Sequence, residues 1–379
     1  MRKAKVLIVD DAMLIRRLVT DALAADSAIE VVGDAANGRI ALQKIPQLNP
    51  DLVTLDIEMP EMDGLATLRE LRKLYPRLPV IMFSALTERG AADTLEALHM
   101  GASDYVTKPS SAAGKAVAQA RIHDDLVPKI RSLCRVGLSA TIAAPPPPRE
   151  RQAPATASTA ASARAVRPPI QADERADAIA MGVSTGGPNA LREILSALPA
   201  DFAAPIVVVQ HMPNIFTRFL AERLNGQTSL TVVEAADGQV IRRGTVYVAP
   251  GDFHLTVHRR NGDVVAALGQ EPPQHSHRPA ADVLFRSVAE VYGARALGLV
   301  LTGIGEDGLR GSEDIARAGG RVLVQDEATS TVWEMPGRIA RAGLADAVLP
   351  LGEVAAELVR RTESPAGVGD TVRRPGVGV

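Results

Sequence analysis

The chain has 379 residues, 46% of them hydrophobic, and a formal net charge of −2 at pH 7. This length is typical of two domains, and the hydrophobic content excludes a wholly disordered or collagen-like chain. A single cysteine, Cys134, excludes a disulfide scaffold and favours a reducing compartment, so we expect a cytoplasmic protein. The first apolar run stops at an Asp pair too early for a secretory signal, and no apolar stretch approaches the roughly 18 residues of a membrane span, so we expect no membrane insertion.

The first part of the chain alternates short β-branched runs with amphipathic stretches. The runs lie at residues 6–9, 31–32, 52–55, 80–83 and 104–106. Repeated strand and helix units of this kind predict an α/β domain with a five-stranded parallel sheet and helices on both faces. We assign this domain to residues 1–125.

The composition changes abruptly between Ser139 and Arg175, where Ala, Pro, Ser and Thr dominate and four prolines follow one another. Such a segment has too little apolar surface to offset its ordering entropy. We therefore predict that residues 126–175 hold the end of a helix and a semi-extended linker. Residues 363–379 are predicted to form a flexible tail.

A second α/β domain is predicted for residues 176–362. Buried strands are expected at 178–183, 206–209, 245–248, 297–301 and 321–324, and helical patterns occur at 189–197 and 281–291. A doubly wound parallel sheet again fits this alternation.

Polar residues follow four of the five predicted strands of the first domain. Asp10 and Asp11 follow the first strand, Asp56 the third, Ser84 the fourth and Lys108 the fifth. The carboxyl ends of parallel strands share one edge, so these residues should converge there. Clustered carboxylates need a cation, and oxygen ligands suit Mg²⁺. Any one Asp alone is better explained as a helix cap or a solvated loop residue, but the set indicates a phosphoryl site with Asp56 as nucleophile.

The segments that carry this pocket resemble the receiver domains of two-component response regulators. They are VDDA at 9–12, TLDIEMPEMDG at 54–64, FSALTERG from Phe83, and Lys108 with the following proline. The resemblance implies a flavodoxin-like fold in which a sensor histidine kinase phosphorylates Asp56. It further implies that Asp10, Asp11 and Asp56 hold Mg²⁺, that Ser84 and Lys108 contact the phosphoryl group, and that Tyr105 takes part in the switch.

The second domain opens with the segment GVSTGGP, residues 182–188, between a predicted strand and a predicted helix. A G-x-S-x-G turn there lifts the hydroxyl of Ser184 out of the chain, and neighbouring backbone N–H groups can bind an oxyanion. The same turn could cradle a phosphate, but a dinucleotide site expects an acid after the next strand, and that strand ends at Gln210 and His211. A histidine can act as general base for the serine.

A third member of such a site should be a carboxylate that orients the imidazole. The segment LTGIGEDG at 301–308 offers both Glu306 and Asp307 after another buried strand. The spacing alone leaves both residues open.

Five segments of this domain resemble the catalytic domain of the chemotaxis protein-glutamate methylesterases, over nearly all of residues 177–348. They are GVSTGGP, VVQHMP, YVAPG, HRPAADVLF and LTGIGEDG. The resemblance implies a triad of Ser184, His211 and Asp307, with backbone N–H groups near Thr185 and Ile304 stabilising the oxyanion. Two positions depart from the family's pattern, since Ile304 stands where Met is usual and Ala280 where Ser is usual.

The resemblance also implies the reaction and its setting. The substrates are glutamate methyl esters on methyl-accepting chemotaxis receptors, methanol is released, particular receptor glutamines are deamidated, and phosphorylation exerts control. No cofactor is expected in this domain, and we read His275 and His277 as groove or loop residues because no cysteine ligands accompany them.

Two other functions are weighed against this one. A DNA-binding output is disfavoured because residues 176–362 carry 17 Arg, no Lys and 21 acidic residues, the wrong sign for neutralising phosphates, so no nucleic-acid partner is expected. A degenerate esterase that only binds a partner is disfavoured because all three triad residues are present.

Overall fold

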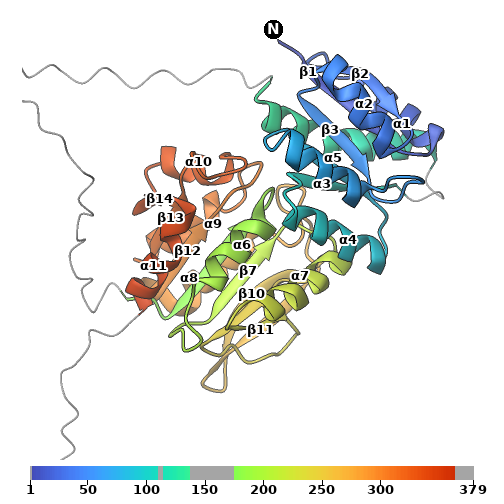
Figure 1. Ribbon diagram of the computed structural model, residues 1–379. Helices are drawn as coiled ribbons and strands as arrows, with labels where there is room; N and C mark the ends of the chain where they lie inside the picture. The colour runs from blue at the N-terminus through green and yellow to red at the C-terminus, as the bar shows by residue number, and fades with distance from the viewer. Residues whose placement is uncertain (1, 110–113, 137–174, 363–379) are drawn as a thin grey trace, which may run out of the picture.

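A computed structural model of the protein describes residues 2–109, 114–136 and 175–362 (Figure 1). Most of the predicted linker and the predicted tail lie outside the described residues. No helix within these three ranges is long and apolar enough to cross a membrane.

The N-terminal domain is a five-stranded parallel sheet with the strand order β2-β1-β3-β4-β5. Its elements in chain order are β1 (Ala4–Val9), α1 (Met13–Leu23), β2 (Ile29–Ala35), α2 (Gly38–Leu48), β3 (Leu52–Asp56), α3 (Gly64–Leu74), β4 (Val80–Ser84), α4 (Glu88–His99), β5 (Asp104–Thr107) and α5 (Lys115–Cys134). Strand side chains alternate between two cores, one shared with α1 and α5 and the other with α2, α3 and α4. The predicted doubly wound, flavodoxin-like sheet is confirmed.

Local signals explain where several of these helices begin. The side chains of Asn37, Asp63 and Thr87 accept hydrogen bonds from backbone N–H groups in the first turns of α2, α3 and α4. Helix α5 runs on to Cys134 and packs Leu126 and Ile130 into the N-terminal core. The domain limits drawn from the sequence remain a prediction.

The C-terminal domain has a seven-stranded parallel sheet with the strand order β14-β13-β12-β6-β7-β9-β8. Its elements are β6 (Ala178–Val183), α6 (Gly187–Ser196), β7 (Ile206–Gln210), α7 (Asn214–Gln227), β8 (Thr231–Glu234), β9 (Thr245–Val248), β10 (His254–Arg260), β11 (Asp263–Gly269), α8 (Ala281–Tyr292), η2 (Gly293–Arg295), β12 (Ala296–Val300), α9 (Leu309–Arg317), β13 (Arg321–Gln325), α10 (Met335–Arg341), β14 (Ala347–Leu349) and α11 (Leu351–Thr362). Helices α6, α7 and α11 cover one face, and α8, α9 and α10 cover the other. The predicted second doubly wound domain is confirmed.

An antiparallel hairpin of β10 and β11 was not expected from the sequence. Its turn is Asn261-Gly262, with φ values of 52° and 91°. This dipeptide is a strong signal for a two-residue hairpin turn, so the sequence did contain the information. The hairpin packs on α8, where Ser287 accepts a hydrogen bond from the N–H of Val257 at 3.1 Å.

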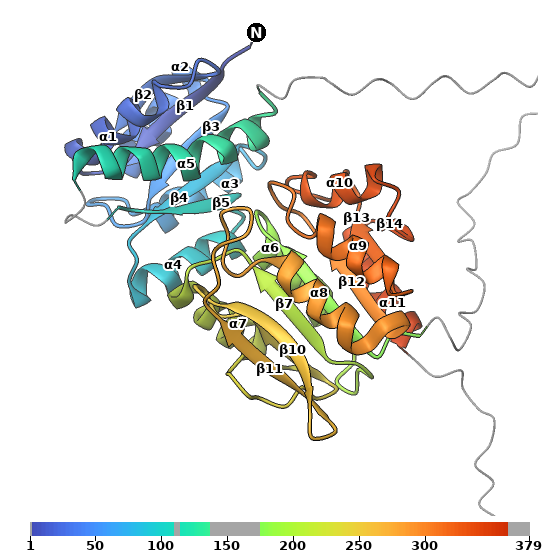
Figure 2. The ribbon, with the colours of Figure 1, turned by 180° about the vertical axis from the view of Figure 1, so that it is seen from behind.

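The two domains are in contact at the carboxyl edge of the second sheet. Both views show α4 beside α6 and α7, with β5 facing the same edge (Figures 1 and 2). The strand order changes direction between β6 and β12, and in doubly wound sheets ligands bind at such a point. The N-terminal domain therefore lies over the expected ligand site.

Candidate active site

Ser184 directly follows β6 and begins the turn into α6. Gly186 in this turn has φ 81°, a left-handed value that favours glycine, and a Cβ on Gly187 would lie 2.0 Å from Oε1 of Gln210. The Ser184 carbonyl accepts hydrogen bonds from Gly187 N and Gln210 Nε2, at 2.8 Å and 3.0 Å. The two glycines and Gln210 thus fix a tight turn that presents the serine at the strand end.

His211 and Asp307, the pair that the family resemblance implies, lie in contact. His211 follows β7, which is the parallel neighbour of β6 in the sheet, and its Nε2 lies 2.8 Å from Oδ2 of Asp307. Because a carboxylate only accepts, this contact places the proton on Nε2 and leaves Nδ1 with a free lone pair. Nδ1 of His211 is buried and has no hydrogen-bond partner.

The Asp307 carboxylate is held by several donors as well as by His211. Its oxygens accept hydrogen bonds from the backbone N–H groups of Ala281, Asp282 and Gly308, at 2.6, 2.9 and 3.0 Å. Burial acts to raise the pKa of Asp307, but these bonds and His211 outweigh it and lower the pKa below its ordinary value. Glu306, the alternative carboxylate, instead lies near His275 and Arg338.

The two residues expected to supply oxyanion donors lie on either side of the serine. Thr185 is buried, and its hydroxyl donates to Oδ2 of Asp104 in the N-terminal domain at 2.5 Å. Ile304 follows Gly303, which packs directly against the Ser184 side chain, and the next residue, Gly305, donates its N–H to Glu334 at 3.0 Å. The oxyanion role of both residues stays a prediction.

A cavity of about 340 Å³ lies beside Ser184 and has walls from both domains. From the C-terminal domain it is lined by Ser184, Thr185, His211 and His277, among others. From the N-terminal domain it is lined by residues that include Asp104, Tyr105, Asp125 and Lys129. In this arrangement the N-terminal domain forms part of the wall around the candidate nucleophile.

The predicted acidic pocket is present at the carboxyl edge of the first sheet. Ligand atoms of Asp10, Asp11 and Asp56 lie within 4.8 Å of one another, and Lys108 Nζ is 3.0 Å from Asp10 Oδ2 and 2.7 Å from Asp56 Oδ2. Burial and then the charge of Asp10 raise the pKa of Asp56 to about 6. A cluster of two buried carboxylates and one exposed carboxylate fits a divalent cation.

The other two predicted switch residues make contacts outside the carboxylate cluster. Ser84 donates its hydroxyl to the carbonyl of Gly90 in α4 at 3.0 Å. The Tyr105 ring stacks on Phe216 of α7, with ring centroids 4.8 Å apart, and Tyr105 is only 7% exposed. Tyr105 is therefore part of the interface between the domains.

Sequence reasoning missed the polar residues that join the domains. Asp104 accepts from Thr185 and lies 3.7 Å from Lys129, and burial raises the pKa of Asp104. Asn189 of α6 donates to the carbonyl of Leu98 at 2.7 Å. Thr185 and Asp104 are 81 residues apart in the chain, Asn189 and Leu98 are 91 apart, and no local pattern reveals such pairs.

Family profiles match both domains. The response regulator receiver domain profile matches residues 6–117, and the CheB methylesterase profile matches residues 179–358. The chain is thus a response regulator whose output domain is of the methylesterase class.

Full-length relatives extend this result over nearly the whole chain. A protein-glutamate methylesterase/protein-glutamine glutaminase of Trichodesmium erythraeum (strain IMS101) is 48% identical, with 95% of this chain and 99% of the relative aligned. A protein with the same description from Nocardioides sp. (strain ATCC BAA-499 / JS614) is 49% identical, with 94% and 95% aligned. The chain is also similar to the crystal structure of the Thermotoga maritima CheB methylesterase catalytic domain, with 42% sequence identity and a TM-score of 0.48. The alignment covers 48% of this chain and 97% of the Thermotoga maritima chain. The chain belongs to the protein-glutamate methylesterase/protein-glutamine glutaminase family.

Proposed function

We propose that the protein hydrolyses glutamate methyl esters on methyl-accepting chemotaxis receptors and deamidates particular receptor glutamines, in the cytoplasm, under control of phosphorylation. The observation that carries the proposal is the 2.8 Å contact between His211 and Asp307 at a cavity that Ser184 also lines. A serine at a strand-to-helix turn with such a His-Asp pair is the arrangement of an acyl-transfer site.

The chemistry follows from the positions of these groups. Ser184 Oγ attacks the γ-carbonyl of the ester while His211 Nδ1 takes its proton, and the buried Asp307 carboxylate stabilises the imidazolium that forms. His211 then protonates the leaving methanol, and water hydrolyses the acyl-enzyme to free glutamate and serine. A glutamine side chain follows the same route with ammonia as the leaving group. Backbone N–H groups of Thr185 and Ile304 are the proposed oxyanion donors.

Control begins in the acidic pocket of the receiver domain. We infer that Asp56 accepts a phosphoryl group from a chemotaxis sensor histidine kinase, with Mg²⁺ held by Asp10, Asp11 and Asp56. The cation neutralises charge on the phosphoryl oxygens when it is bound. Lys108, now paired with Asp10 and Asp56, would turn to the phosphoryl group, as would the Ser84 hydroxyl.

The route from this pocket to the cavity is short. Lys108 directly follows β5, and β5 carries Asp104 and Tyr105, which contact Thr185 and Phe216. A shift of Lys108 toward a phosphoryl group would therefore act on a strand that contributes to the contact between the domains. We propose that the unphosphorylated receiver covers the cavity and that phosphorylation favours an open arrangement.

The test is methanol release from receptor membranes carrying labelled methyl esters, measured with and without a small phosphodonor and Mg²⁺. We expect Ser184→Ala to abolish release and Asp56→Ala to remove only the response to the phosphodonor. Ser196→Ala, a change at an exposed serine of α6, is the matched control and should behave as wild type. Release that persists in Ser184→Ala would contradict the proposal.

A further inference from the structure

The loop before α8 makes a tight turn beside the candidate general base. Gln274 and His277 exchange two backbone hydrogen bonds of 2.8 and 3.0 Å, and the residues between them, His275 and Ser276, have φ values of 49° and 65°. Residues with a side chain rarely adopt this left-handed conformation. Contacts from the surroundings must therefore hold the turn in place.

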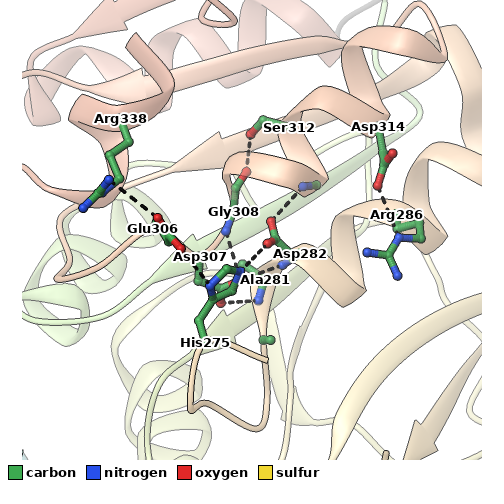
Figure 3. Close-up of polar contacts among 12 residues, drawn as sticks. His275, Ala281, Asp282, Arg286, Glu306, Asp307, Gly308, Ser312, Asp314 and Arg338 are labelled. Atoms are coloured by element: carbon green, nitrogen blue, oxygen red, sulfur yellow. Dashed lines mark hydrogen bonds and ion pairs between the residues drawn. The ribbon is translucent and has the colours of Figure 1, made fainter. Parts of the chain in front are cut away.

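The His275 side chain supplies such a contact. Its Nε2 lies 2.8 Å from Oδ2 of Asp282 in α8, and its Nδ1 lies 3.5 Å from Glu306, which in turn pairs with Arg338 (Figure 3). Asp282 is 1% exposed, and its other oxygen accepts the N–H of Gly311 at 2.7 Å. The turn is thus fastened to a carboxylate that is itself fixed between α8 and α9.

His277, at the end of the turn, lies flat against His211. The two ring centroids are 3.9 Å apart and the ring planes differ by 11°. Burial and then the neighbouring His211 lower the pKa of His277 to about 3, so its imidazole is neutral at physiological pH. A neutral, flat partner supports the His211 ring without repelling the imidazolium formed during the reaction.

These contacts form a connected network around His211. Asp307 holds the edge of the ring through Nε2, and it also accepts from the first two N–H groups of α8, which belong to Ala281 and Asp282. Asp282 binds His275, and the tight turn that contains His275 places His277 against the face of the His211 ring. One helix terminus therefore anchors both the edge contact and the face contact.

A metal site is a weaker explanation of the same residues. Ligand atoms of His275, Asp282 and Asp307 lie within 4.8 Å of one another, as metal ligands would. However, all four carboxylate oxygens already accept hydrogen bonds from protein N–H groups. The geometry fits a hydrogen-bonded support better than a cation site.

We propose that His277 is a positioning residue for His211 and that the His275–Asp282 pair holds His277 against it. This inference rests on the proposed function, because it takes His211 as the general base. The edge contact with Asp307 still permits rotation about the line of that hydrogen bond. The stacked face removes this freedom and holds the imidazole in one orientation for proton transfer from Ser184.

The experiment compares methanol release by the full-length chain from labelled receptor membranes, activated by a phosphodonor and Mg²⁺ so that domain contacts do not mask the effect. We expect His277→Ala to lower kcat roughly tenfold to a hundredfold with KM nearly unchanged, because small misplacements of a catalytic group have effects of this size. His277→Phe, which keeps a flat neutral ring, should restore most of the loss. His275→Ala should lower kcat in the same way, and His258→Ala, on the exposed hairpin, is the control.

A second readout does not depend on receptor binding. The rate at which a fluorophosphonate labels Ser184 should fall in parallel with kcat, while the melting temperature of His277→Ala stays close to that of wild type. Wild-type kcat and labelling in His277→Ala, or a raised KM with unchanged kcat, would overturn the positioning role alone. A wild-type protein that neither releases methanol nor reacts at Ser184 would overturn the proposed function instead.

Discussion

Replacing Thr185 by valine removes the hydroxyl that joins the two domains while keeping the shape of the side chain and the backbone N–H. The hydroxyl donates to the buried Asp104 carboxylate at 2.5 Å. A hydrogen bond to a charged group contributes about 1.5 to 3 kcal/mol. Each 1.4 kcal/mol changes an equilibrium constant about tenfold, so loss of this hydrogen bond lowers the ratio of closed to open protein roughly 10-fold to 150-fold.

The expected result is a rise in unphosphorylated activity that is limited by the activity of the phosphorylated protein. Initial rates of methanol release with and without phosphodonor measure both values. Thr231→Val, at an exposed position of the edge strand β8, is the matched control. Asn189→Ala should act in the same direction but by a smaller factor, because its acceptor is the neutral carbonyl of Leu98.

An unphosphorylated Thr185→Val protein with wild-type activity would refute this reasoning. A loss of activity in the phosphorylated variant would refute it in another way, because the hydroxyl would then serve the reaction itself rather than the domain contact.

Three other predictions concern charge. Asp307→Asn should lower kcat by roughly 10² to 10⁴. The same change should reduce the free energy of unfolding by about 1–3 kcal/mol, because backbone donors of α8 lose a carboxylate oxygen. Wild-type kinetics or an unchanged thermal melt would be inconsistent with this prediction. The pKa of Asp56 is raised to about 6, so the attacking carboxylate is lost as the pH falls through 6. At sub-saturating Mg²⁺ the rate of phosphorylation should therefore fall about tenfold for each pH unit below 6. Phosphoprotein electrophoresis from pH 5 to 8 measures this rate, and a flat pH profile would argue against the prediction. Arg223→Ala removes a partly exposed ion pair with Glu96 between the domains, so the activity of the unphosphorylated protein should rise less than about fivefold. A rise as large as that expected for Thr185→Val would contradict the prediction that this ion pair contributes less than the Thr185 hydrogen bond.

Most of the fold could be predicted from the sequence because the central strands are largely apolar runs. Every residue of β3, β4, β6 and β12 is buried, which agrees with the apolar runs from which these strands were predicted. The short strands β8 and β14 were missed because they lie at the sheet edges and carry exposed or half-buried residues. Edge strands resemble loops in composition.

The candidate site was predictable where each residue follows a strand. Ser184, His211 and Asp307 follow buried strands of the second sheet, so topology indicates that these three residues meet at its carboxyl edge. Asp56 ends a buried strand of the first sheet, which places it at the carboxyl edge of that sheet. The contacts of His275, Asp282 and Asp104 depend on how loops and domains pack. His275 has a φ of 49°, a left-handed value that is uncommon for residues other than glycine, and no glycine marks this turn in the sequence.

The position of Asp307 at the start of α8 also bears on how this protein can change over evolutionary time. In many enzymes a lineage that no longer needs activity can replace a catalytic residue and gain stability, because such residues are often poorly accommodated by the fold. Here the same carboxylate serves the helix terminus through two backbone N–H groups. A descendant that kept only a binding role would be free to lose Ser184, but selection for folding alone would retain the aspartate.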